Sequence, residues 1–478
     1  MSLPVYSFRR IGVNAMAVLG GDVLNKAGTF LVYAILSRSA SVHEFGQLSL
    51  GLLLLYTFHV FAVAGLPVAL TREVAKRRRT ARRLLKHGYL AAVLTSLLAM
   101  LTMIGLAIAM QYERQTVIVI ALLALAVPPY ALTMITEAVI KGREQMHLIT
   151  VGNLPGNVFL VISSFIAMSA GYGVATVAAV IVVSRCITLL VMHRLLIWGT
   201  VDCRPGRLHP RLAWLLLRRS TVFLGTDGMH AVGAALSGVL LSKFASEREL
   251  GLLGASYQLL QPIQMFYRSV GHSCFPQLVS AARTNGAAVG DLARPLLGLI
   301  LRLAVPATIG VFCLAGDLLV TVYGNPDFRA GAVVFQIVAF TLLLDPLNPI
   351  LGHGLWAMGR DKTVLNIVIV NVVTNAIAGV WLIGYYGLIG AAYTSIAASA
   401  INLLQHYWCF QRDVAKLHLG RELLRIVPPT LLAIGCLTLL PIHRYAALTI
   451  ALSLYMLLAF FRLDLLTLGS PATQDSGK

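Results

Sequence analysis

Cationic side chains occur inside long apolar stretches of this chain, where charges are rare. One such stretch carries Gln261, Gln264 and Arg268, whose i, i+3 and i+7 spacing places them on one face of a helix. An ionisable side chain at the centre of a membrane helix costs roughly 2.5–3.5 kcal/mol on insertion scales, so it usually faces a water-filled cavity. Because arginine makes paired hydrogen bonds to phosphate, this face predicts a cavity that receives an anionic group.

Further ionisable residues lie in similar apolar surroundings. Three cations are predicted to line the same substrate-binding cavity: Lys26, Arg185 and Arg302. Three acids are predicted to act in gating or in coupling to H⁺ or Na⁺: Asp22, Asp227 and Asp345. Pro346 and Pro349 should open the helix beside Asp345, since proline donates no backbone hydrogen bond.

Simpler interpretations stay open for some of these residues. Asp22 and Lys26 stand four residues apart and could pair with each other on one helix face. Arg302 could extend its guanidinium to the inner membrane surface instead of into a cavity. The sequence therefore leaves open whether Lys26 contacts a substrate or only neutralises Asp22.

Enzyme signatures are missing from the sequence. It contains no HExxH, P-loop, GxGxxG or GxSxG motif, and its six cysteines form no CxxC pair. We therefore expect a protein that is not an enzyme, with no catalytic residues, no metal site and no cofactor.

Helices that cross a membrane must position the polar residues. Of the 478 residues, 58% are hydrophobic and only 12% are charged, against about 25% charged in soluble domains. With about 20 apolar residues per span, the chain predicts an all-α polytopic membrane protein with about fourteen transmembrane helices. The net charge of +19 falls mainly in connections on one side. This predicts cytoplasmic termini by the positive-inside rule, and no nucleic-acid partner.

The two halves of the chain are related. At an offset of 205 residues, the second half repeats five residues of the first: Gly20/Gly225, Asp22/Asp227, Ser41/Ser246, Glu44/Glu249 and Gly46/Gly251. Two parallel six-helix repeats predict a pseudo-twofold axis along the membrane normal. The predicted domains, around a central cavity, are an N-lobe (1–200, helices 1–6), a cytoplasmic linker with an interfacial helix (201–215), a C-lobe (216–411, helices 7–12) and helices 13–14 with a cytoplasmic tail (412–478).

Three stretches carry a resemblance to a known family. They are Asp22 to the Glu44-Phe45-Gly46 segment, Leu216 to the Phe275-Pro276 segment, and Ala357-Met358-Gly359-Arg360. With the predicted helix plan, they make the chain similar to the polysaccharide (Wzx-like) flippases of the multidrug/oligosaccharidyl-lipid/polysaccharide exporter superfamily.

The resemblance implies a function. Such proteins move undecaprenyl-diphosphate-linked oligosaccharides across the bacterial inner membrane by alternating access, for cell-surface polysaccharides such as exopolysaccharide or lipopolysaccharide. It implies a monomer whose partners are the lipid-linked substrate, membrane lipids, and the polymerase and glycosyltransferases of the same pathway. It also implies that the cavity cations (Lys26, Arg185, Arg268 and Arg302) bind the diphosphate or acidic sugars.

Other functions remain as alternatives. An ion-coupled multidrug or toxin extruder of the same superfamily would use Asp22 and Asp227 to take organic cations, but the intramembrane cations disfavour it. A lipid II flippase shares the plan of fourteen spans, although its usual motifs are not evident. A membrane-embedded polysaccharide polymerase or ligase would need long outward loops, which the chain lacks.

Overall fold

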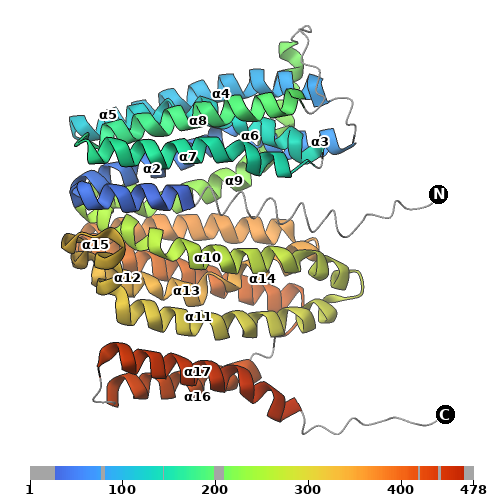
Figure 1. Ribbon diagram of the computed structural model, residues 1–478. Coiled ribbons are helices and arrows are strands. Elements are labelled where there is room, and N and C mark those ends of the chain that lie inside the picture. Colours follow the sequence, from blue (N-terminus) through green and yellow to red (C-terminus); the bar gives the residue numbers. More distant parts are fainter. Residues whose placement is uncertain are drawn as a thin grey trace, which may run out of the picture. The chain divides into compact units, whose positions relative to one another are not determined.

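The protein is built from helices (Figure 1). The computed structural model describes residues 27–76, 81–143, 145–198, 209–417, 420–439 and 443–467, and within these ranges no strand occurs. The same ranges contain eight helical segments long and apolar enough to cross a membrane, and two shorter apolar helices, Leu424–Leu439 and Tyr445–Phe460. The chain is therefore an all-α, multi-pass membrane protein, and the count of fourteen spans stays a prediction.

The chain forms two compact units, and each unit is made of three separate stretches of the sequence. Unit 1 comprises Met1–Gly254, Val320–Phe328 and Ala376–Ala391. Unit 2 comprises Ala255–Leu319, Arg329–Asn375 and Ala392–Lys478. Several helices contribute residues to both units, so each unit is described by itself.

Unit 1 contains a helical segment at 27–39 and eight complete helices. These are α2 (Val42–Val63), α3 (Leu66–Lys76), α4 (Ala81–Ala109), α5 (Arg114–Ala124), α6 (Val127–Gly142), α7 (His147–Ser169), α8 (Val174–Trp198) and α9 (Pro210–Phe244). One cluster of its core draws on six of them, and its buried residues include Leu70, Leu85, Ile135, Ile149, Met192 and Leu216. Residues 211–215, predicted to lie in an interfacial helix, instead open the continuous helix α9.

Unit 2 contains most of α10 (Glu247–Ala282) and α11 (Gly286–Tyr323). It also contains α12 (Ala332–Ala339), α13 (Thr341–Leu344), α14 (Leu347–Ala357), the two ends of α15 (Asp361–Asp413), α16 (Gly420–Leu439) and α17 (Arg444–Thr467), and half of the 3-10 helix η2 (Pro326–Gly331). The long helix α15 is two helices joined at Gly387, whose φ of 53° suits a residue without a β-carbon. Helices α16 and α17 pack side by side (Figure 1).

Equivalent residues of the two sequence repeats begin α2 and α10 in the same way. Ser41 and Glu44 form a capping box in which each side chain accepts a hydrogen bond from the other residue's backbone N–H. Ser246 and Glu249 make the same two bonds, at 3.2 and 3.1 Å. The repeat in the sequence is therefore a repeat in local structure, because both pairs satisfy N–H groups that a helix start leaves open.

The repeated glycines mark a close crossing of these two helices. A β-carbon on Gly46 would overlap the carbonyl oxygen of Glu247, and one on Gly251 would overlap the carbonyl oxygen of Val42. The offset of 205 that relates Gly46 to Gly251 also relates Val42 to Glu247. The contact is thus reciprocal, as contacts across a twofold axis are.

Candidate functional site

A polar face on α10 brings the predicted glutamines and arginine together in unit 2. Tyr257, Gln261, Gln264 and Arg268 follow one another at spacings of three or four residues, so they share one side of the helix. The two glutamines are half-buried and Arg268 is exposed. Arg268 is close enough to Asp345 for their charges to interact. Two predicted site elements, the polar stripe and Asp345, therefore meet in one place.

Asp345 lies where its helix is interrupted. Helix α13 ends at Leu344 and α14 begins at Leu347, with Asp345 between them. Pro346 has no N–H to donate four residues back, so the regular ladder fails at this point. The backbone N–H of Asn348 turns instead to the carbonyl of Asp345, at 3.3 Å. The predicted opening beside Asp345 is present.

Helix α15 supplies hydroxyl groups to the same cluster. Ser399 makes a hydrogen bond with the Asp345 side chain. Ser395, one turn earlier, makes a short hydrogen bond with the hydroxyl of Tyr257, which in turn lies within electrostatic reach of Asp345. The sequence analysis missed these three hydroxyl residues. The only available signal was the four-residue spacing of the two serines, which is common in apolar helices.

Arg302 has a different environment in unit 2. It forms a short ion pair with Glu422 of α16, and both residues are buried. Arg425 binds the other carboxylate oxygen of Glu422 at 3.3 Å. A β-carbon on Gly298 would overlap Glu422, so this glycine makes room for the acid. The structure thus places Arg302 in an ion pair with α16, and its predicted role toward a substrate stays a prediction.

Arg185 lies in unit 1 among aromatic rings. Its guanidinium carbon is 4.9 Å from the centroid of the Tyr130 ring, a cation–π distance. The His59 ring packs 4.7 Å from the same tyrosine, and its Nδ1 is 2.5 Å from the carbonyl oxygen of Tyr56. Arg185 therefore belongs to a polar aromatic cluster from α2, α6 and α8, and the sequence analysis had not singled out His59 or Tyr130.

Asp227 also belongs to unit 1, on α9. Its side chain is exposed and lies within electrostatic reach of His230, one turn further along the helix. The neighbouring Gly228 packs against the Phe61 ring of α2. Two further predicted site residues, Asp22 and Lys26, lie outside the described residues.

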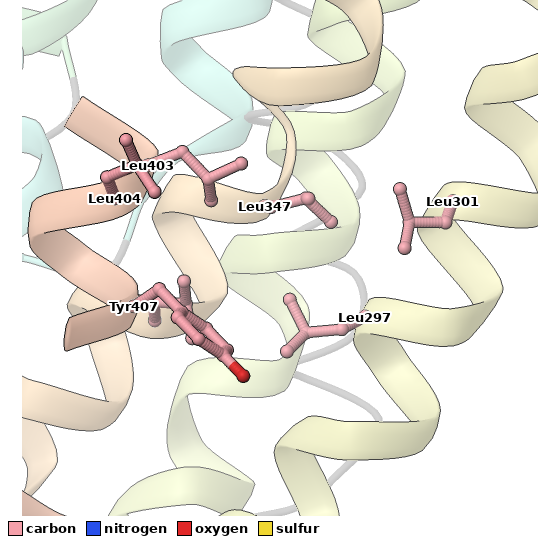
Figure 2. A pocket seen from close by; sticks show the side chains of 7 residues that line it. Leu297, Leu301, Leu347, Leu403, Leu404 and Tyr407 are labelled. Carbon is pink, nitrogen blue, oxygen red and sulfur yellow. The ribbon is translucent and has the colours of Figure 1, made fainter. Parts of the chain in front are cut away.

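An apolar pocket of about 170 Å³ opens between three helices of unit 2. Figure 2 shows leucines of α11 on one side and Leu403, Leu404 and Tyr407 of α15 on the other. Leu404 is 65% exposed, so the pocket lies at the surface of the unit. All but one of its lining residues are leucines, so the pocket is apolar.

The predicted polar residues thus lie within a scaffold of long apolar helices. A family model described as "Polysaccharide biosynthesis protein" matches residues 11–281, which is more than half of the chain. The chain therefore belongs to this family, and the resemblance stated from the sequence is confirmed.

One curated relative and several solved structures are similar to the chain. It is 21% identical over 168 residues to the "probable low-salt glycan biosynthesis flippase Agl15" of Haloferax volcanii. That match covers 35% of this chain and 35% of the relative, so it spans about a third of the relative's length.

The structural matches cover far more of the chain and show its fold. A lipid II flippase, MurJ, in an inward closed conformation superposes with a TM-score of 0.73 at 14% identity, over 95% of this chain and 99% of that one. An inward-facing multidrug resistance MATE family transporter of the MOP superfamily gives a TM-score of 0.64 at 11% identity, over 83% and 98%. The reported relatives are described as flippases or transporters and not as enzymes.

Proposed function

We propose that this protein is a flippase that moves a lipid-linked oligosaccharide from one membrane leaflet to the other. The observation that carries the proposal is the cluster on α10, where Arg268, Gln261 and Gln264 share a face beside Asp345. Membership of the polysaccharide biosynthesis family supports a saccharide substrate. The flippase name of the curated relative supports translocation.

The cluster suits the head group of such a substrate. A guanidinium matches the oxygens of a diphosphate with paired, charge-assisted hydrogen bonds. Glutamine amides and the hydroxyls of Tyr257 and Ser395 can exchange hydrogen bonds with sugar hydroxyls. The apolar pocket of unit 2 offers a surface to the hydrocarbon tail. These features fit an undecaprenyl-diphosphate-linked oligosaccharide of a bacterial inner membrane, carried by alternating access.

Asp345, the acid in the cluster, has a proposed role both with and without bound substrate. With no substrate, Asp345 offsets the charge of Arg268. When a diphosphate binds the arginine, the two anions compete for it. Uptake of H⁺ or Na⁺ at Asp345 would relieve that competition, so this acid is the proposed coupling group.

Translocation in liposomes tests the proposal. The substrate is a fluorescent sugar on undecaprenyl diphosphate, and the readout is the fraction that an impermeant quencher reaches. We expect Arg268→Ala to abolish translocation, and Arg268→Lys to lower it strongly because an ammonium cannot bind a diphosphate in bidentate fashion. Arg283→Ala is the matched control, since Arg283 is an exposed arginine in the turn after α10. Equal rates in the Arg268→Ala and Arg283→Ala proteins would remove the α10 face from the site.

The same liposomes separate the flippase from its main alternative. A drug extruder would expel a fluorescent organic cation and leave the lipid-linked sugar in place. The exposed arginine on the α10 face should repel such a cation, so we expect no cation transport by the unaltered protein.

A further inference from the structure

Three segments of unit 1 bring a histidine and two glutamates together. His43 stands at the start of α2, Glu113 immediately before α5, and Glu247 at the start of α10. The Nε2 atom of His43 lies 3.3 Å from an oxygen of Glu113 and 3.3 Å from an oxygen of Glu247. One ligand atom from each residue falls within 4.8 Å of the others.

These distances match the ligand shell of a zinc-type ion. Bonds of about 2.0–2.1 Å from zinc to nitrogen and oxygen, at tetrahedral angles, place neighbouring ligand atoms about 3.3–3.4 Å apart. A shared proton fits less well. Charge-assisted hydrogen bonds are usually about 2.7–2.9 Å long, and a single N–H cannot point at both carboxylates. The three groups therefore face a common point, and the amide nitrogen of Gln47 also lies 3.3 Å from the Nε2 atom of His43.

The buried acid of the group is held in place from behind. The hydroxyl of Thr116 donates to Oε1 of Glu247 at 2.5 Å, and the amide of Gln47 donates to Thr116 at 3.1 Å. Glu247 is only 9% exposed, and its other oxygen, the one facing His43, has no hydrogen-bond partner. Partners that orient one oxygen while the other stays open are typical of metal-binding carboxylates.

The surroundings leave the group accessible. His43 is 45% exposed and Glu113 is 59% exposed, so an ion can enter from solution. Lys243 packs over the Tyr112 ring at 4.9 Å, and the Tyr112 hydroxyl bonds to Ser242 at 2.7 Å.

The sequence repeat does not produce a second such group at the equivalent position. At the offset of 205, His43 corresponds to Arg248 and Glu247 corresponds to Val42. Neither replacement can bind a metal ion. A single site would therefore stand beside the Gly46–Gly251 crossing and break its symmetry.

We propose that His43, Glu113 and Glu247 bind one divalent cation of the zinc type, with water as a fourth ligand. Imidazole nitrogen with carboxylate oxygen suits zinc better than magnesium, which prefers oxygen ligands alone. The ion would join the starts of α2, α5 and α10 at the end of unit 1 that the charge pattern predicts to be outside. This is a separate property from transport, and it stands whether or not the chain is a flippase.

Metal analysis of the purified full-length protein tests this site. The protein is prepared in detergent without a histidine tag, stripped with chelator, and given Zn²⁺ with a large excess of Mg²⁺. We expect one zinc per chain, and visible absorption bands of tetrahedral Co²⁺ when cobalt replaces zinc. We expect His43→Ala and Glu247→Gln to lose the ion. Thr116→Val should weaken its binding by about 10–100-fold, since it removes only the orienting bond.

Two further proteins make the result decisive. His147→Ala removes an exposed histidine at the start of another helix and should keep the full zinc content. His43→Cys should keep the ion and give a thiolate-to-cobalt charge-transfer band, which also shows that the altered protein is folded. Zinc at less than one per chain in the unaltered protein, or equal zinc in His43→Ala and His147→Ala, would show adventitious binding and overturn the proposal.

Discussion

The buried charge of Arg302 is compensated by an ion pair with Glu422. Both are almost fully buried, and the acid receives a second arginine, Arg425. Removing one partner leaves an uncompensated charge in a low-dielectric interior, where the cost is typically about 3–5 kcal/mol. This triad is therefore expected to fix the C-terminal helices to α11 more than it adds net stability.

Replacing Glu422 with alanine should destabilise the protein by about 3–5 kcal/mol, because Arg302 is left buried without a counter-ion. Thermal unfolding followed by tryptophan fluorescence measures the loss. The double variant Arg302→Met/Glu422→Leu removes both charges and should recover most of the stability. If the double variant is as unstable as the single one, packing and not charge explains the defect.

Asp345→Asn is predicted to separate translocation from its driving force. The amide keeps the shape and the hydrogen bond to Ser399 but cannot take up H⁺ or pair with Na⁺. We expect translocation in liposomes to become independent of imposed proton and sodium gradients. Asp327→Asn, a substitution of an exposed acid in η2, is the comparison. A full gradient response in Asp345→Asn protein would place coupling elsewhere.

At the scale of single residues, the sequence predicted polar clusters better than it predicted ion pairs. The stripe of Gln261, Gln264 and Arg268 was visible because helical spacing is encoded locally. Glu422 was not, because it stands 120 residues from Arg302 in a segment that reads as an ordinary charged helix start. The sequence also gives no local sign that His43, Glu113 and Glu247 lie close together, since the three are distant in sequence.

At the scale of helices, the capping boxes of α2 and α10 are expected to contribute measurably to the stability of the protein. Each serine and glutamate pair satisfies backbone N–H groups at a helix start. Ser41→Ala and Ser246→Ala should each lower stability by about 0.5–2 kcal/mol, measured by thermal unfolding. Thr438→Ala, which removes a hydroxyl bound only to its own helix, should have less effect. Unequal losses at the two serines would mean that the repeats use their caps differently.

The crossing of α2 and α10 should resist even one extra carbon. Gly46→Ala and Gly251→Ala each drive a methyl group into the opposite backbone, which cannot bend away as a side chain could. Overpacking usually costs about 1–3 kcal/mol, so both variants should unfold at lower temperature. Gly105→Ala is the control, because nothing lies within 4 Å of its added carbon. Normal melting of Gly46→Ala protein would contradict the close crossing.

Helix breaks were easier to predict than helix starts. The opening beside Asp345 follows from Pro346, whose effect on backbone hydrogen bonds does not depend on tertiary context. The start of α9 was harder. Cations at Arg211 and Arg218 suggested a separate helix on the membrane surface, yet no proline after Pro210 interrupts the segment and the helix runs on to Phe244.

At the scale of the whole molecule, the all-α fold could be predicted from the sequence. The division of the chain into two compact units could not. Unit 1 takes in Val320–Phe328, which covers the last turn of α11 and the residues that follow it. There Tyr323 and Phe328 stack at 4.8 Å and meet the ring of Phe45 at 5.5 and 5.1 Å. Apolar aromatics look alike in a membrane sequence, so nothing local identifies these partners.

The topology of the whole chain has a direct test across one helix. Thr284 and Asp327 are exposed at the two ends of α11. Because positive charges mark the side of Thr284 as cytoplasmic, Asp327→Cys should react with an impermeant maleimide in intact cells and Thr284→Cys only after permeabilisation. The native cysteines are first replaced with serine. The opposite labelling pattern would invert the predicted orientation.

The reciprocal contact of Gly46 and Gly251 has an evolutionary interpretation. If the chain arose from duplication of a half-length gene, the ancestral product would have paired with a second copy of itself. One glycine codon would then have served both sides of that early dimer. After fusion the two codons became free to change separately, yet steric contact still ties each to the backbone facing it. His43 and Arg248, one position beyond Val42 and Glu247, are where the two copies have since diverged.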